Sequence, residues 1–207
     1  MTSKETKSGT EVVVESPLLA VSLPQRVEEA RIVLAKDWRE DWAGLGAGAF
    51  RDTVARVVVD RGVQGLTEEQ QARYRALSDK ADIKTDFGIF LTNALPLSSS
   101  SLMGVFPQIN RINHSCLPNC DQVFSDCSLT PKLSATAQSW DEEAKVERVT
   151  VTSDLEAGTE LTTSYLDLAS LGLEPSWQAR HQYLEDNCGF SCVCCLCSLQ
   201  SRGEGAR

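Results

Sequence analysis

The stretch of sequence that decides the fold is short and reads Asn113-His114-Ser115-Cys116-Leu117-Pro118-Asn119-Cys120. Two further dense strings follow it along the chain. One reads Glu160-Leu161-Thr162-Thr163-Ser164-Tyr165, and the other reads Phe190-Ser191-Cys192-Val193-Cys194-Cys195-Leu196-Cys197. Together the three strings supply the candidate residues for a functional site.

The cysteines are concentrated in the second half of the chain. None of the eight occurs in the first 115 residues, and five fall within residues 188–197. Tetrahedral Zn(II) takes four thiolate or imidazole ligands, and C-x-C and C-x-x-C spacings let neighbouring thiols converge on one ion. Because so short a tail cannot build a core that buries five thiols, the spacing predicts a metal site. The register stays open, since Cys192 with Cys195 and Cys194 with Cys197 are both C-x-x-C pairs, and a fourth ligand can come from elsewhere.

Composition places the chain among ordinary globular proteins. Its 207 residues are 42% hydrophobic and 24% charged, which predicts one main domain. The net charge of −9 argues against nucleic acid as a direct ligand, because that binding needs a basic face. The acidity suits a basic protein tail as partner, or only keeps the protein soluble. No apolar run approaches the roughly 20 residues of a membrane span, and residues 1–10 lack an apolar signal stretch, so we expect a soluble intracellular protein.

Hydrophobic periodicity predicts an α+β protein. We expect helices at residues 25–42, 50–62, 68–77 and 176–186, and strands at residues 11–15 and 18–23. Thr67 and Gln70 form the pattern of a capping box before the third helix. Residues 145–152 alternate and are expected to pair with residues 160–164 through a turn at 156–159. Residues 88–97, 104–106 and 121–125 are expected to form short strands or loops.

The three strings resemble the motifs of the SET-domain protein lysine methyltransferases. The N-H-S-C-x-P-N, E-L-T-x-x-Y and post-SET F-x-C-x-C-x-x-C motifs occur here in the family's order. The resemblance extends over most of residues 11–197 and is closest to fungal-type SET proteins related to the SET-and-MYND group, which residues 87–96 also resemble. The MYND finger itself is absent, because it would need cysteines in the first half of the chain.

This resemblance implies a specific architecture. The expected fold is α+β, a SET-domain β-clip of small sheets with a helical insertion and a C-terminal post-SET zinc motif. The SET domain would cover residues 8–187, with the helical insertion at 25–86, the zinc motif at 188–197 and a disordered tail at 198–207. SET domains begin with a strand carrying G-x-G. Only seven residues precede Ser8 and none of them is Gly, so the chain is expected to start just inside the domain.

The resemblance also implies roles for individual residues toward S-adenosylmethionine. Asn113 and His114 would hold this methyl donor, Asn93 would approach it from the preceding segment, and Phe190 would stack on its adenine. Tyr165 would be the catalytic tyrosine. Taken singly, each residue has a structural explanation: a tyrosine, histidine or phenylalanine in the core, or an asparagine in a turn. The three motifs in order favour the functional interpretation.

The same resemblance resolves the register of the metal site. The structural Zn(II) ligands would be Cys116, Cys192, Cys194 and Cys197, which leaves Cys195 outside. The remaining cysteines, at positions 120, 127, 188 and 195, are expected to be free thiols rather than a second metal site.

Two classes of function stay open from the sequence. The first is a S-adenosylmethionine-dependent lysine methyltransferase that acts on a histone or another protein, as a monomer in the nucleus, the cytoplasm or both. The second is a catalytically weak SET-fold module that binds a protein partner and lacks part of the cofactor pocket. The missing G-x-G is the feature behind the second class.

Overall fold

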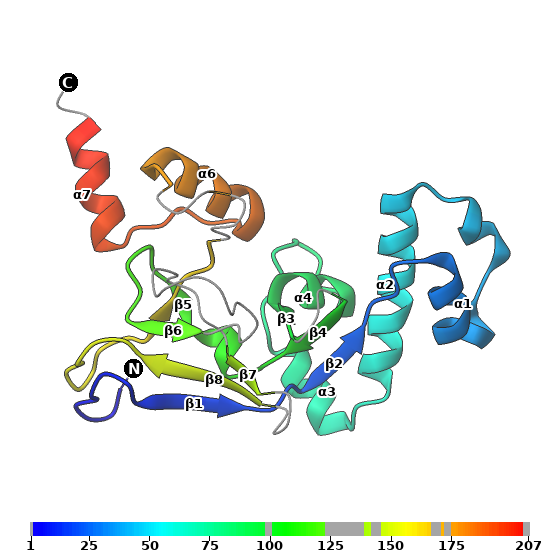
Figure 1. Cartoon of the computed structure of the whole chain (residues 1–207), viewed down its shortest axis with the longest axis horizontal. Coiled ribbons are helices and arrows are strands. Elements are labelled where there is room, and N and C mark those ends of the chain that lie inside the picture. Colours follow the sequence, from blue (N-terminus) through cyan, green and yellow to red (C-terminus); the bar gives the residue numbers. More distant parts are fainter. Residues whose placement is uncertain are drawn as a thin grey trace. The chain divides into compact units, whose positions relative to one another are not determined.

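The computed structural model describes residues 2–97, 101–122, 139–141, 146–166, 171 and 175–204. The chain forms two compact units, one of Met1–Glu15 with Arg111–Arg207 and one of Ser16–Asn110. Both units contain helices and strands (Figure 1), as the periodicity predicts. Across the described ranges, no helix combines the length and the apolar character needed to cross a membrane.

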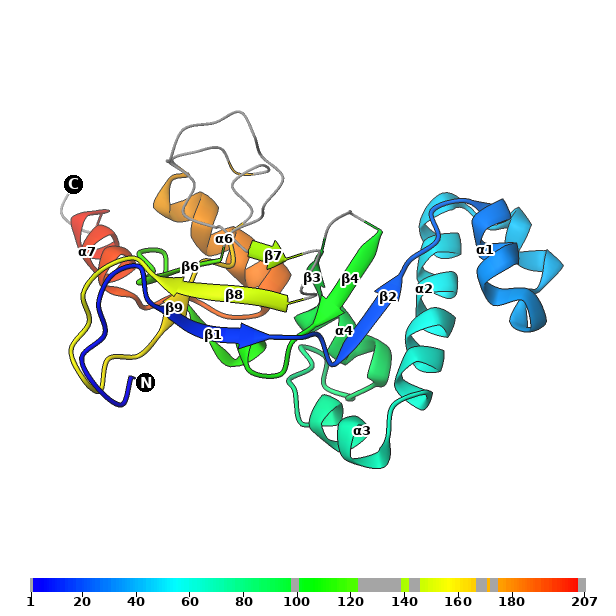
Figure 2. The ribbon, with the colours of Figure 1, turned by 60° about the horizontal axis from the view of Figure 1, so that its bottom comes forward.

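The first unit is built on an antiparallel sheet around β8 (Val146–Val151). β8 pairs with β1 (Glu11–Glu15) along one edge, and with β6 (Cys120–Gln122) and β7 (Ser139–Asp141) along the other. Figures 1 and 2 both show β1 lying alongside β8. Alternate residues of β8 are buried, among them Val149 and Val151, because successive side chains of a strand point to opposite faces. The predicted strands at residues 11–15 and 145–152 are therefore confirmed.

The predicted pairing of residues 145–152 with residues 160–164 is wrong. β9 (Thr162–Thr163) instead runs parallel to β5 (Asn113–His114), which follows the 3-10 turn η3 (Ile109–Arg111). Both edges of β8 are already occupied by other strands. The segment after β8 pairs with the N-terminus, where Thr6 and Leu155 exchange main-chain hydrogen bonds of 2.9 and 2.8 Å. These non-local contacts override the local hairpin signal.

Two helices end the first unit. α6 (Trp177–Cys188) begins at Ser176, whose Oγ accepts a hydrogen bond from the Ala179 N–H, and it ends at Gly189 in the left-handed conformation, with φ of 75°. The helix predicted at residues 176–186 is therefore present. α7 (Cys195–Glu204) extends through most of the stretch expected to be a disordered tail. Residues 189–194 connect the two helices and hold Phe190 and the first cysteines of the tail.

The second unit packs helices on a three-stranded sheet with the order β2 (Leu19–Ser22), β4 (Leu102–Val105), β3 (Leu95–Pro96). α2 (Ala47–Gln64) contributes Val54, Val59 and Val63 to its core. A Cβ at Gly62 would lie 2.8 Å from the Leu19 side chain on β2, so the glycine permits close packing of helix on strand. Since α2 continues to Gln64, the predicted end of this helix at Gly62 is two residues too early.

The other helices of this unit differ from the expectation in specific ways. α1 (Val27–Leu34) is shorter than the predicted helix 25–42 and gives way to the 3-10 turns η1 (Ala35–Asp37) and η2 (Glu40–Gly44). α3 (Glu68–Arg75) begins with the predicted capping box. Residues 88–93, part of the stretch predicted to form short strands or loops, belong to a helix, α4 (Asp86–Asn93). The Thr85 Oγ1 caps it by accepting from the Gly88 N–H, and Phe87 and Phe90 are buried at helical spacing.

Candidate active site and metal centre

The first two motifs lie side by side in the first unit. Asn113 is opposite Thr162 and His114 is opposite Thr163 in the parallel β5–β9 pair. The Ser115 N–H extends this pairing by donating to the Thr163 carbonyl at 2.9 Å. Two chain segments almost fifty residues apart therefore form one framework.

Asn119, at the end of the first motif, fastens the start of the second. Its Oδ1 accepts from the Thr162 N–H at 2.9 Å, and its Nδ2 donates to the Glu160 carbonyl at 2.8 Å. One side-chain amide thus satisfies both a main-chain donor and a main-chain acceptor at the start of the second motif. This explains why an asparagine closes the N-H-S-C-x-P-N string.

A cavity of about 440 Å³ opens between these motifs and the segment after α6. Its volume lies in the range of small-molecule sites. The residues that line it come from all three strings: Asn113, His114, Ser115, Glu160, Thr162, Tyr165, Phe190, Ser191, Cys192, Val193 and Cys194. The Asn113 Nδ2 donates to the Glu160 Oε1 at 2.7 Å, so a carboxylate with a fixed orientation stands at its wall.

His114 is held as a neutral ring with one defined tautomer. Its Nδ1 accepts from the Tyr165 main-chain N–H at 3.0 Å, so the ring proton resides on Nε2. The Nε2 lies 3.3 Å from the Cys116 Sγ, at hydrogen-bonding distance. Burial, with a smaller effect of the Arg180 charge, lowers the pKa of His114 to about 4. At neutral pH this histidine therefore orients neighbouring groups and carries no charge.

Three aromatic rings surround the cavity. The ring centroid of His114 lies 5.4 Å from that of Tyr165 and 5.9 Å from that of Phe190, and the Tyr165 and Phe190 rings meet edge-to-face at 6.3 Å. The Tyr165 hydroxyl donates to the Ile112 carbonyl at 2.5 Å. Burial, reinforced by Cys188, raises the pKa of Tyr165 to about 12. The hydroxyl therefore stays protonated, and its oxygen lone pairs remain available as acceptors.

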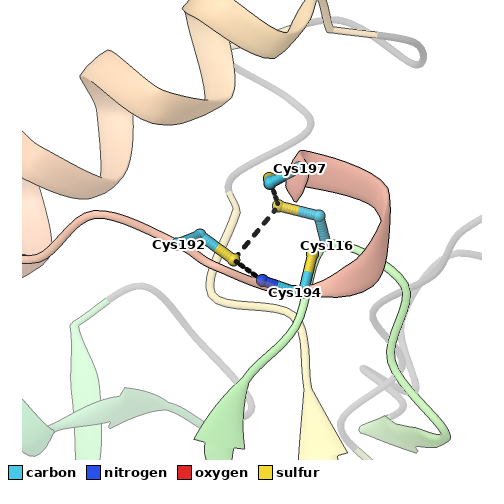
Figure 3. Close-up of side chains that lie close together, drawn as sticks. All are labelled: Cys116, Cys192, Cys194 and Cys197. Carbon is cyan, nitrogen blue, oxygen red and sulfur yellow. Dashed lines mark hydrogen bonds between the residues drawn. The ribbon is translucent and has the colours of Figure 1, made fainter. Parts of the chain in front are cut away.

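Four cysteine sulfurs converge beside this cavity. Cys116 follows β5, Cys192 and Cys194 lie in the connection before α7, and Cys197 lies in its first turn (Figure 3). Their sulfur atoms all lie within 4.8 Å of one another, and the Cys116 Sγ is 3.9 Å from that of Cys192 and 3.5 Å from that of Cys197. Four thiolates at about 2.3 Å from a tetrahedral zinc ion stand roughly 3.8 Å apart. The arrangement therefore fits a tetrahedral metal ion.

The other cysteines do not join this group. Cys195 is exposed, Cys120 is buried against Asn119, and neither these nor Cys188 belongs to a metal-ligating cluster among the described residues. Position 127 lies outside the described residues. Of the two C-x-x-C registers that the spacing allows, the structure thus brings together the one that contains Cys194 and Cys197.

Asn93 lies in the second unit, at the last turn of α4. Its Nδ2 donates to the Ser78 and Ile89 carbonyls, each at 2.7 Å, and its own carbonyl accepts from the Asn110 side chain. The residue is 6% exposed. Within its unit, Asn93 thus connects three chain segments through hydrogen bonds. Its contact with a cofactor remains a prediction.

Sequence reasoning missed two residues of the site. Glu160 stands in the second motif and its side chain reaches the cavity, but nothing in its spacing marks it as a wall residue. Arg180 lies on α6, is 6% exposed, and interacts electrostatically with Cys116 and Cys197. An arginine on an otherwise polar helix gives no sequence signal of burial.

The family model described as SET domain matches residues 2–166, which is most of the chain. The chain belongs to the SET-domain family. The adjacent N-H-S-C and E-L-T-x-x-Y motifs are thus those of a SET domain, and the predicted family is confirmed.

Curated relatives share this domain. Over 138 residues the chain is 32% identical to the histone-lysine N-methyltransferase set5 of Schizosaccharomyces pombe, covering 65% of this chain and 36% of that protein. Over 125 residues it is 30% identical to the human histone-lysine N-methyltransferase SMYD3, covering 58% and 24%. Over 124 residues it is 29% identical to the histone-lysine N-methyltransferase ASHR1 of Arabidopsis thaliana, covering 58% and 21%. The matches therefore span about a third or less of these relatives' length.

Proposed function

We propose that this chain is a S-adenosylmethionine-dependent protein lysine N-methyltransferase. The observation that carries the proposal is a cavity that three separate motifs build together and that Tyr165, His114 and Phe190 border. The relatives act, by their names, on histone lysines or protein lysines, and we extend that substrate class to this chain. A net charge of −9 favours a basic substrate tail.

The residues of the cavity fit the proposed cofactor. Phe190 offers an aromatic face for a purine ring, and the Glu160 carboxylate offers an acceptor for hydroxyl or amino groups. S-adenosylmethionine supplies a methyl group on a sulfonium centre, which leaves to a nucleophile in one direct displacement. The protein has no covalent step to perform, so its contribution is to position two partners and to exclude water.

Lysine must lose its proton before it can accept a methyl group. With an ordinary pKa near 10.4, only roughly one lysine in 2,500 is neutral at pH 7, which costs roughly 4.6 kcal/mol. An apolar, aromatic-lined site lowers this cost by disfavouring the ammonium form. The Tyr165 oxygen, whose proton is directed to Ile112, can accept a hydrogen bond from the amine and orient its lone pair.

We further propose that Cys116, Cys192, Cys194 and Cys197 hold one structural Zn(II) ion. The close approach of the four sulfurs supports this, because four neighbouring thiolates repel one another unless a cation neutralises them. Cys116 and Cys192 are 76 positions apart, so the ion would fix the segment that carries Phe190 at the edge of the cavity.

Calorimetric titration with S-adenosylmethionine, followed by radiolabelled methyl transfer to histones and other basic proteins, tests the proposal. Tyr165→Phe should lower methyl transfer far more than it lowers cofactor affinity, since the hydroxyl acts mainly in the transition state. Tyr183→Phe, on α6 outside the cavity, is the matched control. Cofactor binding without methyl transfer to any basic protein would contradict the enzymatic assignment and favour a binding module.

A further inference from the structure

Arg180 is a buried cation that the proposed reaction does not use. It lies on α6 and is 6% exposed, although arginine is rarely buried unless it is paired. Leu184, one turn further along the helix, is fully buried, so the two residues share the inner face of α6. A charge placed there must be balanced by its surroundings.

The guanidinium is held in a fixed orientation by two neighbours. Its Nη1 donates to the Pro175 carbonyl at 2.7 Å, and its Nη2 donates to the Gln200 Oε1 at 2.5 Å. Gln200 lies three residues after Cys197 on α7, hence on the same face of that helix. The contact with Gln200 therefore places the guanidinium over the face of α7 that carries a sulfur of the cluster.

Neither of these neighbours neutralises the charge, because a carbonyl and an amide are both uncharged. The Arg180 Nε is buried and has no hydrogen-bond partner among the described residues. Two cluster thiols, those of Cys116 and Cys197, lie close enough to the guanidinium to interact with it electrostatically.

A metal centre with four thiolates needs such a partner. Zn(II) carries two positive charges and four thiolates carry four negative ones, so the bound centre has a net charge of −2. Burying that charge is unfavourable unless a cation stands close to it. Groups around a metal's ligands commonly change its affinity by about 10 to 100-fold.

We propose that Arg180 is the counter-ion of the four-cysteine centre and that its charge sets the metal affinity of that centre. This role rests on the metal site proposed above. Arg180 lies close to two of the ligands and would not bind the metal itself, so it is a positioning and charge-balancing residue. It also links α6 to α7 through Gln200.

Zinc affinity, measured by competition with a chromophoric chelator on the full chain, tests this role. Arg180→Met keeps an unbranched stem but removes the charge, and it should weaken zinc binding by about 10 to 100-fold. Arg180→Lys keeps the charge and should recover most of that loss. Arg148→Met is the matched control, because Arg148 pairs with Glu11 on the β1–β8 sheet and lies outside the cluster; its zinc affinity should not change.

Cobalt(II) substitution separates a charge effect from a structural one. The absorption spectrum of a tetrahedral four-thiolate site should be the same in the wild-type chain, Arg180→Met and Arg180→Lys. If Arg180→Met does not fold, Gln200→Leu provides the second test, because this variant keeps the Arg180 charge and removes only a hydrogen-bond partner of the guanidinium. The zinc affinity of Gln200→Leu should fall less than tenfold.

Three outcomes overturn the proposal. Equal zinc affinity of wild-type and Arg180→Met would show that the charge is irrelevant. A loss in Arg180→Lys as large as that in Arg180→Met, or a cobalt spectrum that loses thiolate character, would assign Arg180 a structural role only. A wild-type chain that takes up no metal would refute the metal site itself together with its counter-ion.

Discussion

Glu147 gives the protein a pH-dependent stability that one substitution should remove. Its side chain is fully buried in β8, and neither carboxylate oxygen has a hydrogen-bond partner among the described residues. The residue opposite on β1 is Glu15, also buried and also acidic, and the residue opposite on β7 is Trp140, so neither register partner brings a positive charge. Burial raises the pKa of Glu147 from 4.5 to about 8.

The size of the effect follows from this difference in pKa. Because the folded carboxyl has the higher pKa, the folded state binds more protons than the unfolded state between pH 4.5 and about 8. The contribution of the protonated Glu147 carboxyl to stability is therefore fully present below pH 4.5. It falls as the pH rises through this window, and it is lost above the pKa of the folded state. At about 1.4 kcal/mol for each pKa unit, the loss between pH 5 and pH 8 is about 3 to 4 kcal/mol.

Urea unfolding of the zinc-loaded chain at several pH values between 5 and 8 measures this loss. Glu147→Gln cannot ionise, so its stability should depend on pH less steeply than that of the wild type by this amount. Its absolute stability can lie higher or lower, because a buried amide without partners is itself unfavourable. Glu156→Gln, an exposed control, should keep the wild-type slope. Parallel pH profiles of the wild type and Glu147→Gln would refute the reasoning.

Three other predictions test separate parts of the structure. Cys116→Ser should abolish stoichiometric zinc in metal analysis, because it removes one of the four clustered sulfurs. Cys195→Ser, at an exposed cysteine outside the cluster, should leave the zinc content unchanged. Zinc retained by both variants would contradict the ligand set. Thr67→Ala should lower the free energy of unfolding by about 1 kcal/mol in urea titrations, because it removes the capping box of α3, and an unchanged midpoint would show that this cap contributes nothing. Gly62→Ala should lower the free energy of unfolding by about 1 to 3 kcal/mol, and with it the melting temperature, since the new Cβ would lie 2.8 Å from the Leu19 side chain. A higher melting temperature would show that the Leu19 side chain moves aside without cost.

Much of the local structure was accessible from the sequence because short strings encode it. The capping pattern at Thr67 and the serine at position 176 start helices through hydrogen bonds to residues three positions away. Alternation along residues 146–151 marks a strand with one buried face. The helix at residues 86–93 was missed although Thr85 caps it, because its glycine and its dense apolar residues are equally typical of a short strand.

The candidate site, too, could be predicted from the sequence only in part. The sequence by itself determined the family, the three motifs and the residues Asn113, His114, Tyr165 and Phe190, which all line one cavity. It could not decide the parallel pairing of β5 with β9, since that pairing joins residues 49 positions apart. The side-chain contacts beside it, Asn113 with Glu160 and Tyr165 with Ile112, join residues 47 and 53 positions apart. The local alternation and turn signals favoured a hairpin that the fold does not use.

Only the tertiary structure decided how charge is arranged around the cysteines and in the sheet. Spacing alone allows two C-x-x-C registers, and the convergence of Cys116 with three tail cysteines selects between them. The burial of Arg180 beside the thiols and of Glu147 without a partner has no counterpart in the local sequence. The physical reason is that capping and alternation act over a few residues, whereas burial and electrostatic pairing depend on which distant segments come to lie against a side chain.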